Sequence, residues 1–395
     1  MPEYRFADRA EALRQSSRRT ESGVIVVNKG KIFPPLLPDI SEECQIASKL
    51  TAETMQTGPA MGLTELRNSI VEFVAADGVA CTRDEVLVTN GAKQAIELAC
   101  RVFLNPDDRV IVSAPTFATG LRIIQSHGAQ FLVIPQDEDG MDVAFLEKEL
   151  ARLEAGGEPL PKLLFEVVDL NNPTGSTMPA ARRRHLVDLA KQYNFVILED
   201  SAYRRMRFDE SPAKALKGFD ESGVVVMLGT FSKNLAPGMR LGWAVGAPDI
   251  VQRMAMLKAD GGSSPFTQRV VIEMIRRGRM DEQISLVRSA MRDRCALAIA
   301  AVRRELPDVQ FRTPDGSFYL WIRLPDGLSA RELTMRAREE GVGVASGWDW
   351  FPDHESDSFL RFAYSGVSQI DLEEGIRRLG AAYRSMAATA PGITS

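Results

Sequence analysis

The sequence predicts an α/β protein with two parts. In the large domain a mainly parallel sheet is covered by helices, and a smaller α+β domain is built from both chain ends. Three observations lead to this prediction. From about residue 62, short apolar and β-branched runs alternate with helical segments. Most of these runs are apolar without interruption, as in strands buried on both faces of a parallel sheet. The chain has 395 residues, which is more than one hydrophobic core usually serves.

The first half of the chain shows the alternation most clearly. Residues 1–45 are expected to combine a short charged helix with an irregular segment at 30–40, whose prolines exclude a helix interior. An amphipathic helix with a glycine end signal follows at 62–78. A strand at 85–90 then leads through a glycine into a helix at 91–104.

Strand signals continue along the chain. Further strands are predicted at 108–115, 130–136, 162–170, 195–200 and 223–229. A long helical stretch is expected at about 249–305. Two strands with the alternating polarity of half-exposed strands follow, at 316–324 and 358–365. The predicted large domain covers residues 46–289, and residues 1–45 and 290–395 form the predicted small domain.

Composition excludes several classes of protein. The formal net charge of −5 argues against a nucleic-acid partner, because such proteins carry a basic footprint. The cysteines and the three histidines show no metal-ligand spacing, so we expect no metal. No apolar run reaches the ~18 residues that a membrane span needs. Free thiols and the absence of an apolar leader predict a cytoplasmic protein. The basic run at 182–184 is interpreted as a solvated helix face.

Polar residues stand where several predicted strands end, which is where open α/β sheets bind ligands. Gly91 begins the helix after strand 85–90, so the N–H groups around Ala92 and Lys93 suit an anion such as a phosphate. Asn172 follows the strand at 162–170, and Asp200 ends the strand at 195–200. Read alone, each of these residues also fits a structural role in a turn or a helix cap.

The segment "GTFSKNLAPGMRLGW" at 229–243 carries the most informative lysine, Lys233. A lysine in a partly desolvated pocket has a lowered pKa and forms an imine with an aldehyde. Thr230 and Ser232 offer hydroxyls, and Arg240 offers a guanidinium suited to a phosphate dianion. With the Asp200 carboxylate available to a protonated ring nitrogen, the set describes a site for pyridoxal 5′-phosphate.

Taken in order, these motifs resemble those of the class I/II aminotransferases, the aspartate-aminotransferase-like, fold-type I pyridoxal-phosphate enzymes. The resemblance rests on "TFSKNLAPGMRLGW", "NNPTG" and "EDSAYRRMRF" and covers about residues 56–365. It implies that Lys233 forms the Schiff base with the cofactor and that Asp200 pairs with the pyridine nitrogen. Asn172 and Tyr203 would hydrogen-bond the 3′-oxygen. It also implies a phosphate-binding cup made of Gly91, Ala92, Lys93, Thr230, Ser232 and Arg240.

The resemblance extends to substrate and subunit contacts. Phe117 would stack on the cofactor ring, where relatives usually have tyrosine, and Arg361 would bind the substrate α-carboxylate through a bidentate pair. Relatives form homodimers with shared active sites, yet this chain has Thr57 where they usually carry a tyrosine that reaches the partner's phosphate. The segment around Lys29, Lys31 and Phe33 also departs from the family pattern, and these residues are candidate substrate contacts.

The predicted function is therefore transfer of an amino group between an L-amino acid and a 2-oxo acid. A lyase, a cyclase or an oxidase acting on an amino acid remains an alternative, because the same residues serve each reaction up to proton removal. A ligand-sensing module is the alternative from another class, since some transcription regulators carry an aminotransferase-like domain. We expect the chain before residue 56 to be too short for a DNA-binding domain.

Overall fold

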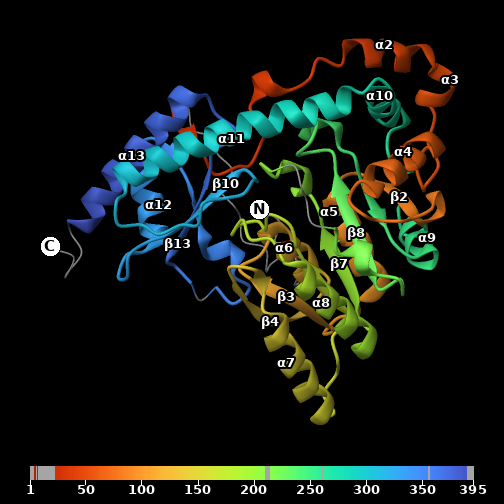
Figure 1. The fold of residues 1–395 in the computed structure, drawn as a ribbon, viewed down its shortest axis with the longest axis horizontal. Helices are drawn as coiled ribbons and strands as arrows, with labels where there is room; N and C mark the ends of the chain where they lie inside the picture. Colours follow the sequence, from red (N-terminus) through yellow and green to blue (C-terminus); the bar gives the residue numbers. More distant parts are fainter. Residues whose placement is uncertain are drawn as a thin grey trace.

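An eight-stranded sheet lies at the centre of the molecule (Figure 1). The computed structural model describes residues 4, 5, 7, 23–209, 214–259, 261–354 and 356–388. The strand order is β2-β9-β8-β7-β6-β3-β4-β5. The strands are β2 (Val86–Thr89), β3 (Arg109–Ala114), β4 (Gln130–Asp137), β5 (Gly140–Met141), β6 (Leu163–Glu166), β7 (Val196–Asp200), β8 (Val225–Thr230) and β9 (Gly242–Val245).

The sheet is mainly parallel, as the sequence predicts. β4, β3, β6, β7 and β8 pair in parallel, whereas β9 runs antiparallel between β8 and β2. β5 pairs antiparallel with β4 at the other edge. The strands predicted between residues 85 and 229 are all present, but the one predicted at 162–170 ends at Glu166. β9 was not predicted, because this short strand begins inside the lysine-containing motif and no turn signal separates it from that motif.

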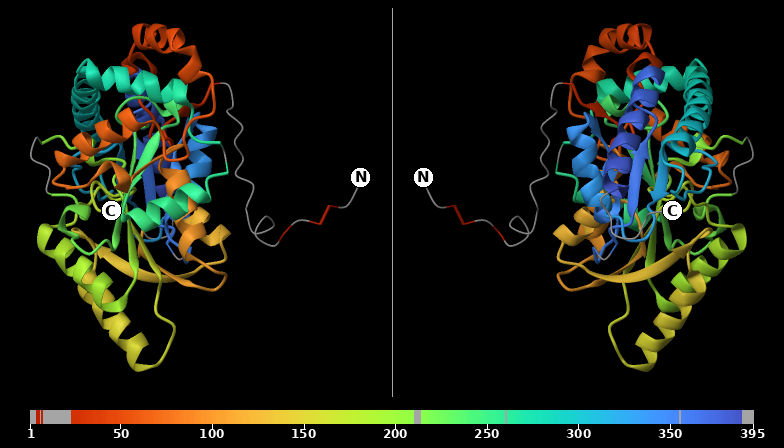
Figure 2. Two further views of the ribbon diagram at one scale, coloured as in Figure 1. Left: turned by 90° about the vertical axis from the view of Figure 1, so that its right-hand side faces the viewer. Right: turned by 90° about the vertical axis from the view of Figure 1, so that its left-hand side faces the viewer.

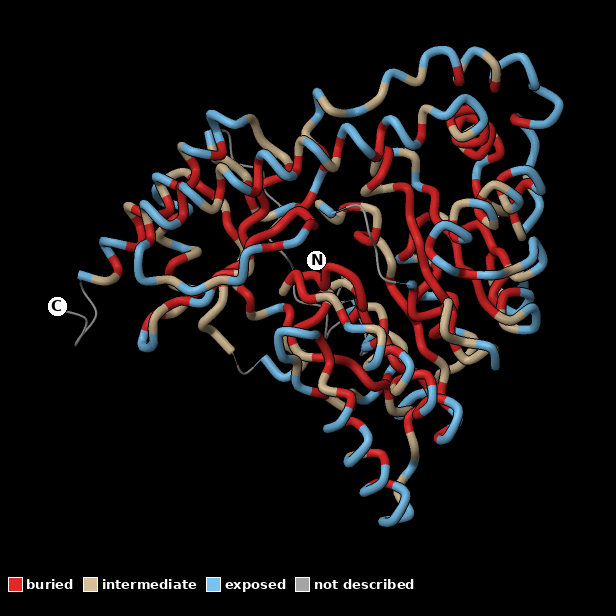
Figure 3. The backbone as a smooth tube through the Cα atoms, in the orientation of Figure 1, coloured by how far each residue is buried: buried red, intermediate tan, exposed pale blue. Residues whose placement is uncertain are grey.

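Helices cover both faces of this sheet. Val110 and Val112 point into a core with helices α5 (Ala92–Phe103), α6 (Ala118–Ser126) and α9 (Pro248–Met256). Ile111, between them, points into a core with α7 (Val143–Ala155) and α8 (Ala180–Tyr193). Because successive residues of a strand alternate between faces, both sets are apolar, which explains the uninterrupted apolar runs. Figure 3 shows the sheet buried and the outer helix surfaces exposed.

A second group of elements brings the N-terminal segment to the C-terminal third of the chain. Its strands are β1 (Ile25–Val26), β10 (Tyr319–Arg323), β11 (Val342–Gly343), β12 (Ala345–Ser346) and β13 (Phe359–Ala363). β1 pairs in parallel with β11, and β13 lies between β10 and β12. The helices are α11 (Arg279–Glu305), α12 (Ala330–Glu339) and α13 (Gln369–Ala387). In Figure 1, α11 runs from α10 beside the large sheet to α13 in this group.

The remaining elements complete the fold, which Figure 2 shows from two further sides. The α-helices are α2 (Ser41–Lys49), α3 (Thr51–Thr54), α4 (Thr64–Ala75) and α10 (Pro265–Arg276). The 3-10 helices are η1 (Pro34–Leu36), η2 (Arg83–Glu85), η3 (Arg204–Met206), η4 (Lys217–Phe219), η5 (Pro237–Met239) and η6 (Gly347–Trp350). The predicted helical stretch at 249–305 is divided into α9, α10 and α11. Among the helices of the described ranges, none combines the length and apolarity of a membrane span.

Two expectations stay predictions. The domain limits are one: residues 46 and 290 fall within helices α2 and α11 rather than in linkers. The short charged helix expected before the proline-rich segment is the other, because most residues before position 23 lie outside the described residues.

Candidate active site

A cavity of about 470 Å³ lies at the carboxyl edge of the large sheet. Its walls come from the ends of β6, β7 and β8, the starts of α5 and α6, the segment at 28–31 and the strands β10 and β13. All of the residues predicted to bind cofactor or substrate line it: Gly91, Ala92, Lys93, Phe117, Asn172, Asp200, Tyr203, Thr230, Ser232, Lys233, Arg240 and Arg361. The fold thus brings together residues as far apart as Asn28 and Arg361, which are separated by 333 positions.

Lys233 lies three residues beyond the end of β8 and points toward the N-terminal segment. Its Nζ donates a hydrogen bond of 2.8 Å to the carbonyl oxygen of Gly30. The same atom lies 5.4 Å from the centroid of the Tyr203 ring. Burial lowers the pKa of the Lys233 amine, and the Arg361 cation acts in the same direction. A larger neutral fraction makes this amine a better nucleophile and a better base.

Asp200 is the last residue of β7 and is only 4% exposed. Its Oδ1 accepts a hydrogen bond of 3.0 Å from the backbone N–H of Ala202. Burial raises the pKa of Asp200 to about 6. A carboxylate in such a position gains from a positively charged ligand group, because the ligand's charge offsets the cost of desolvation.

Another part of the cavity wall, around Gly91 and Arg240, is suited to an anion. Gly91 caps the N-terminus of α5 with φ +88°, and a Cβ at this position would lie 3.2 Å from Nη2 of Arg240. Arg240 also donates to the carbonyl oxygen of Asn90 across 2.9 Å. The Thr230 hydroxyl lies 3.0 Å from that of Ser232. The N–H groups at the start of α5, two hydroxyls and a guanidinium together suit a phosphate dianion.

The Arg361 guanidinium, on β13, is held between two aromatic rings. Its Cζ lies 4.1 Å from the ring centroid of Tyr319 and 4.3 Å from that of Trp350. Nη1 donates to Oδ1 of Asn172 across 2.9 Å, and Nη2 donates to the carbonyl oxygen of Asn28 across 2.8 Å. The side chain is 7% exposed. These contacts therefore fix the plane of the Arg361 guanidinium before a carboxylate binds.

Four contributors to this site were not foreseen. Tyr319 and Trp350 hold Arg361, and the backbone carbonyls of Asn28 and Gly30 accept from Arg361 and Lys233. Tyr319 sits in the predicted strand at 316–324, where an aromatic residue is ordinary. Every residue has a backbone carbonyl, so the sequence does not distinguish those of Asn28 and Gly30. These two contacts, like the position of Trp350 beside Arg361, are seen only in the tertiary structure.

Some of the remaining sequence-based candidates line the cavity and others do not. Lys29 and Lys31 line the cavity, whereas Phe33 lies outside its lining and packs against Arg294, whose Cζ is 4.6 Å from the ring centroid. Thr57 is exposed and does not line this chain's cavity. Phe117 lines the cavity at the start of α6, a position suited to a ring-stacking residue.

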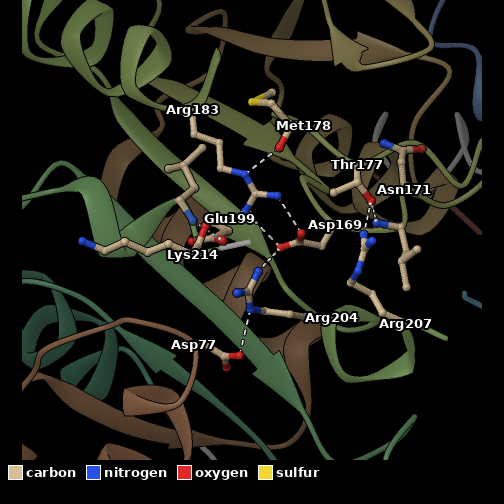
Figure 4. Close-up of polar contacts among 12 residues, drawn as sticks. Asp77, Asp169, Asn171, Thr177, Met178, Arg183, Glu199, Arg204, Arg207 and Lys214 are labelled. Carbon is tan, nitrogen blue, oxygen red and sulfur yellow. Dashed lines mark hydrogen bonds and ion pairs between the residues drawn. The ribbon is translucent and has the colours of Figure 1, made fainter. Parts of the chain in front are cut away.

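A buried ion network holds two of the motifs together (Figure 4). Asp169, in the segment after β6, pairs with Arg183 on α8 and with Arg204 next to Tyr203, each at 2.6 Å. Arg204 also pairs with Asp77 at 2.9 Å. Arg183 is completely buried, so reading the run at 182–184 as a solvated face was wrong for its central residue. The charge patterning did not reveal the carboxylate that Arg183 meets in space.

These groups fit pyridoxal 5′-phosphate. An amine, a buried carboxylate and an anion-binding helix start surround one cavity, matching the aldehyde, the ring nitrogen and the phosphate of that molecule. Asn172 uses its oxygen to accept from Arg361 and Trp350, which leaves its amide N–H groups to donate to a ring oxygen. Fold and site together define an enzyme class that uses this cofactor.

Comparison with known proteins supports this assignment to a pyridoxal-phosphate enzyme class. The family model of aminotransferase class I and II matches residues 35–379, a longer stretch than the expected 56–365. Aromatic-amino-acid aminotransferase 1 of Thermococcus litoralis is 30% identical over 381 residues, covering 94% of this chain and 91% of that protein. The 2-aminoadipate transaminase of Thermus thermophilus is 31% identical over 390 residues, covering 96% and 95%.

A solved structure shows the same fold. That of Pyrococcus horikoshii kynurenine aminotransferase, in complex with PMP, has a TM-score of 0.90 and 31% identity, covering 96% of this chain and 97% of that one. The chain belongs to the class I and II aminotransferase family, and it has the fold-type I architecture predicted from its sequence. It is an aminotransferase, and its cofactor is pyridoxal 5′-phosphate.

Proposed function

We propose that this enzyme exchanges the amino group of an L-amino acid with a 2-oxo acid at the cavity around Lys233. One observation carries the proposal. The lowered-pKa amine of Lys233, the buried carboxylate of Asp200 and the fixed guanidinium of Arg361 face a single cavity. An amino acid needs all three: a proton acceptor, an electron-withdrawing partner and an anchor for its carboxylate.

Each side chain has a distinct task in this proposal. The bound cofactor withdraws electrons from the substrate's α-carbon and so makes its proton acidic. Lys233 would hold the cofactor covalently in the resting enzyme. Once the substrate's amino group replaces it there, the freed Lys233 amine would accept the α-proton as general base and return it as general acid. Asp200 keeps the ring nitrogen protonated. Arg361 orients the carboxylate so that the Cα–H bond faces the Lys233 amine.

The ring and the phosphate are held by the remaining residues. Tyr203 and Asn172 would donate hydrogen bonds to the ring oxygen, and Phe117 would hold the ring by stacking. The phosphate group is bound by Gly91, Ala92, Lys93, Thr230, Ser232 and Arg240. Supporting these assignments, each of these side chains or backbone groups lines the cavity.

We further propose a cytoplasmic homodimer with shared active sites. Two observations support it. Thr57, at the position where relatives reach a neighbouring subunit, is exposed, and so are the large apolar side chains of Met55 (63%) and Met256 (82%). The four cysteines are all free thiols, as a reducing compartment favours. Light scattering during size exclusion tests the dimer, and a monomer with full activity would contradict it.

The test of the reaction is a panel of amino acids with a common 2-oxo acid acceptor. Because relatives carry names for aromatic, 2-aminoadipate and kynurenine transamination, these donors come first. We expect stoichiometric new oxo acid and new amino acid. Release of ammonia or peroxide without an amino-acid product would instead indicate a lyase or an oxidase. Tight binding without turnover of any donor would indicate a ligand-sensing module.

A further inference from the structure

Trp350 joins three parts of the cavity wall, and the reaction as described so far gives its indole N–H no role. The residue ends the short helix η6 and is 7% exposed. Its Nε1 donates a hydrogen bond of 3.3 Å to Oδ1 of Asn172. The Arg361 guanidinium lies over its ring, and its backbone oxygen accepts from the N–H of Thr116 across 2.9 Å. The indole is therefore held in place by contacts from three separate segments.

The hydrogen bonds at Asn172 can run in only one direction. An indole N–H and a guanidinium donate and cannot accept. Nε1 of Trp350 and Nη1 of Arg361 both meet the same end of the Asn172 amide, at 3.3 Å and 2.9 Å. That end must be the oxygen, because turning the amide over would place its N–H groups against two other N–H donors. Among the described residues nothing accepts from these N–H groups, which leaves them for a ligand in the cavity that Asn172 lines.

The two donors to Asn172 differ in what else they must bind. Nη1 and Nη2 of Arg361 contact Asn172 and the carbonyl oxygen of Asn28, and the same guanidinium suits a carboxylate. A bound carboxylate therefore competes with Asn172 for Arg361. The Trp350 indole carries a single N–H, which is already directed at Asn172, so a substrate carboxylate does not draw it away.

We propose that Trp350 is a positioning residue whose indole N–H keeps the Asn172 amide oriented toward the cofactor's ring oxygen while Arg361 binds the substrate carboxylate. The inference rests on the proposed function, which places the ring oxygen of pyridoxal phosphate beside the Asn172 N–H groups. Without the indole, Arg361 alone would hold the amide, and its hold would weaken whenever a carboxylate engaged the guanidinium. Trp350 allows Arg361 to bind substrate without loss of the contact between Asn172 and the cofactor.

The experiment uses the protein loaded with pyridoxal phosphate and follows the pH midpoint of its visible absorbance. A bond donated to the ionised ring oxygen favours loss of the proton from the bound cofactor, so loss of the bond raises the midpoint. Asn172→Ala should raise it by about one unit, the size expected for one hydrogen bond to a charged group. Trp350→Phe keeps an aromatic ring beside Arg361 and removes the N–H. Because Arg361 still holds the amide, this shift should be roughly a tenth to a third of the Asn172→Ala shift.

A saturating carboxylate provides the decisive comparison. The probe is 3-phenylpropanoate or hexanedioate, whichever binds better; they match phenylalanine and 2-aminoadipate but lack the amino group. With the probe bound, the Trp350→Phe shift relative to the parent should grow severalfold, toward the Asn172→Ala shift. Adding Trp350→Phe to Asn172→Ala should cause no further shift in either state, because Trp350 acts through Asn172.

Trp348→Phe is the matched control. It removes an indole from the same short helix, but its ring lies against His354 and Arg331 and does not line the cavity. Its midpoint should equal that of the parent with and without the probe. A second measurement does not depend on folding of the Trp350 variant. In protein with ¹⁵N-labelled tryptophan, Asn172→Ala should move one of the four indole N–H signals upfield in the NMR spectrum.

Four outcomes overturn the inference. Additive shifts in the double variant would mean that Trp350 acts on the cofactor independently of Asn172. An unshifted Trp350→Phe midpoint, or a shift that does not grow with the probe, would mean that Arg361 holds the amide by itself. Four unchanged indole signals would exclude the hydrogen bond. If Asn172→Ala itself leaves the midpoint of the parent, the proposed contact of Asn172 with the ring oxygen fails, so the two failures are distinguishable.

Discussion

Asp169 and Arg204 form an ion pair of 2.6 Å in which neither side chain is more than 2% exposed. The pair joins the segment after β6, which carries Asn172, to the segment after β7, which carries Tyr203. Burial raises the pKa of Asp169, but Arg183 and Arg204 together hold it below its ordinary value. The two segments that carry these cavity-lining residues are therefore connected by a buried ion pair.

Asp169→Asn should lower the free energy of unfolding by about 3–5 kcal/mol, because it leaves two buried guanidinium groups without their shared carboxylate. Urea unfolding at pH 7 measures the change. Glu332→Gln is the control, since its pair with Arg336 lies within one helix and is partly open to solvent, and such pairs contribute about 0.5 kcal/mol or less. Similar losses for the two variants would contradict a dominant role for the buried network.

Lys233→Ala should reduce turnover at least about a hundredfold, because general-base catalysis alone contributes 10²–10⁴-fold. The variant should still bind pyridoxal phosphate without covalent attachment, since the anion-binding end of the cavity is intact. Borohydride treatment of the parent, followed by peptide mass mapping, should place the cofactor on Lys233. Lys162→Ala, a surface variant that loses a pair with Asp108, should keep the label and the turnover. A label on another lysine would refute the assignment.

Asp200→Asn keeps the shape of the side chain but cannot hold a proton on the ring nitrogen. Loss of a charged partner in a dry site is worth about 3 kcal/mol, which corresponds to roughly a hundredfold in rate. Single-turnover kinetics should show the slower proton abstraction. A variant as fast as the parent would refute the role of Asp200 in proton abstraction.

The stability of the cofactor-free protein should also report on Asp200. Its pKa is about 6 in the folded protein and about 3.9 when unfolded, so the folded state disfavours the charged form. The loss of folding stability caused by the charged, buried carboxylate is absent below about pH 4 and complete above about pH 6. Asp200→Asn removes it, so the variant should gain stability relative to the parent as pH rises through this window, by at most about 3 kcal/mol. Urea unfolding at several pH values tests this, and a pH-independent difference would exclude the linkage.

Arg361→Lys should lower kcat/KM for an amino acid about ten- to a hundredfold, since hydrogen bonds to a charged group are worth about 1.5–3 kcal/mol and lysine cannot fix the carboxylate plane. The corresponding amine without a carboxylate should lose much less. The visible spectrum of the resting enzyme should not change. If both substrates lose equally, Arg361 is structural, and Lys29 and Lys31 become the next candidates for the carboxylate anchor.

The sequence predicted the parts of this protein that depend on local pattern. Uninterrupted apolar runs gave the buried strands, and their polar ends gave Asp200, Lys233 and Asn172, because parallel strands must end at one edge. The contacts that arise only when distant segments meet were missed. Tyr319 reads as an ordinary strand residue until β10 is placed beside β13 and the segment at 28–31.

The missed electrostatics have the same origin. Arg183 belongs to a run of three arginines, and nothing along the chain distinguishes it from its exposed neighbour Arg184. Its partner Asp169 lies 14 residues earlier, and the second cation, Arg204, lies 35 residues beyond that carboxylate. Only the fold reveals that one carboxylate serves both.

The two backbone carbonyls at Asn28 and Gly30 have a consequence for affinity. They accept the hydrogen bonds of Arg361, the proposed anchor of the substrate carboxylate, and of Lys233, the proposed site of cofactor attachment. An incoming ligand must therefore replace these backbone carbonyls as hydrogen-bond acceptors. The measured dissociation constant reports the difference in free energy between the bonds to the ligand and the bonds to the carbonyls. A carboxylate wins this competition because its charge makes it a stronger acceptor than a peptide carbonyl, whereas a neutral ester or amide does not. Because the backbone carbonyls already occupy these donors, we expect uncharged substrate analogues to bind more weakly than carboxylates.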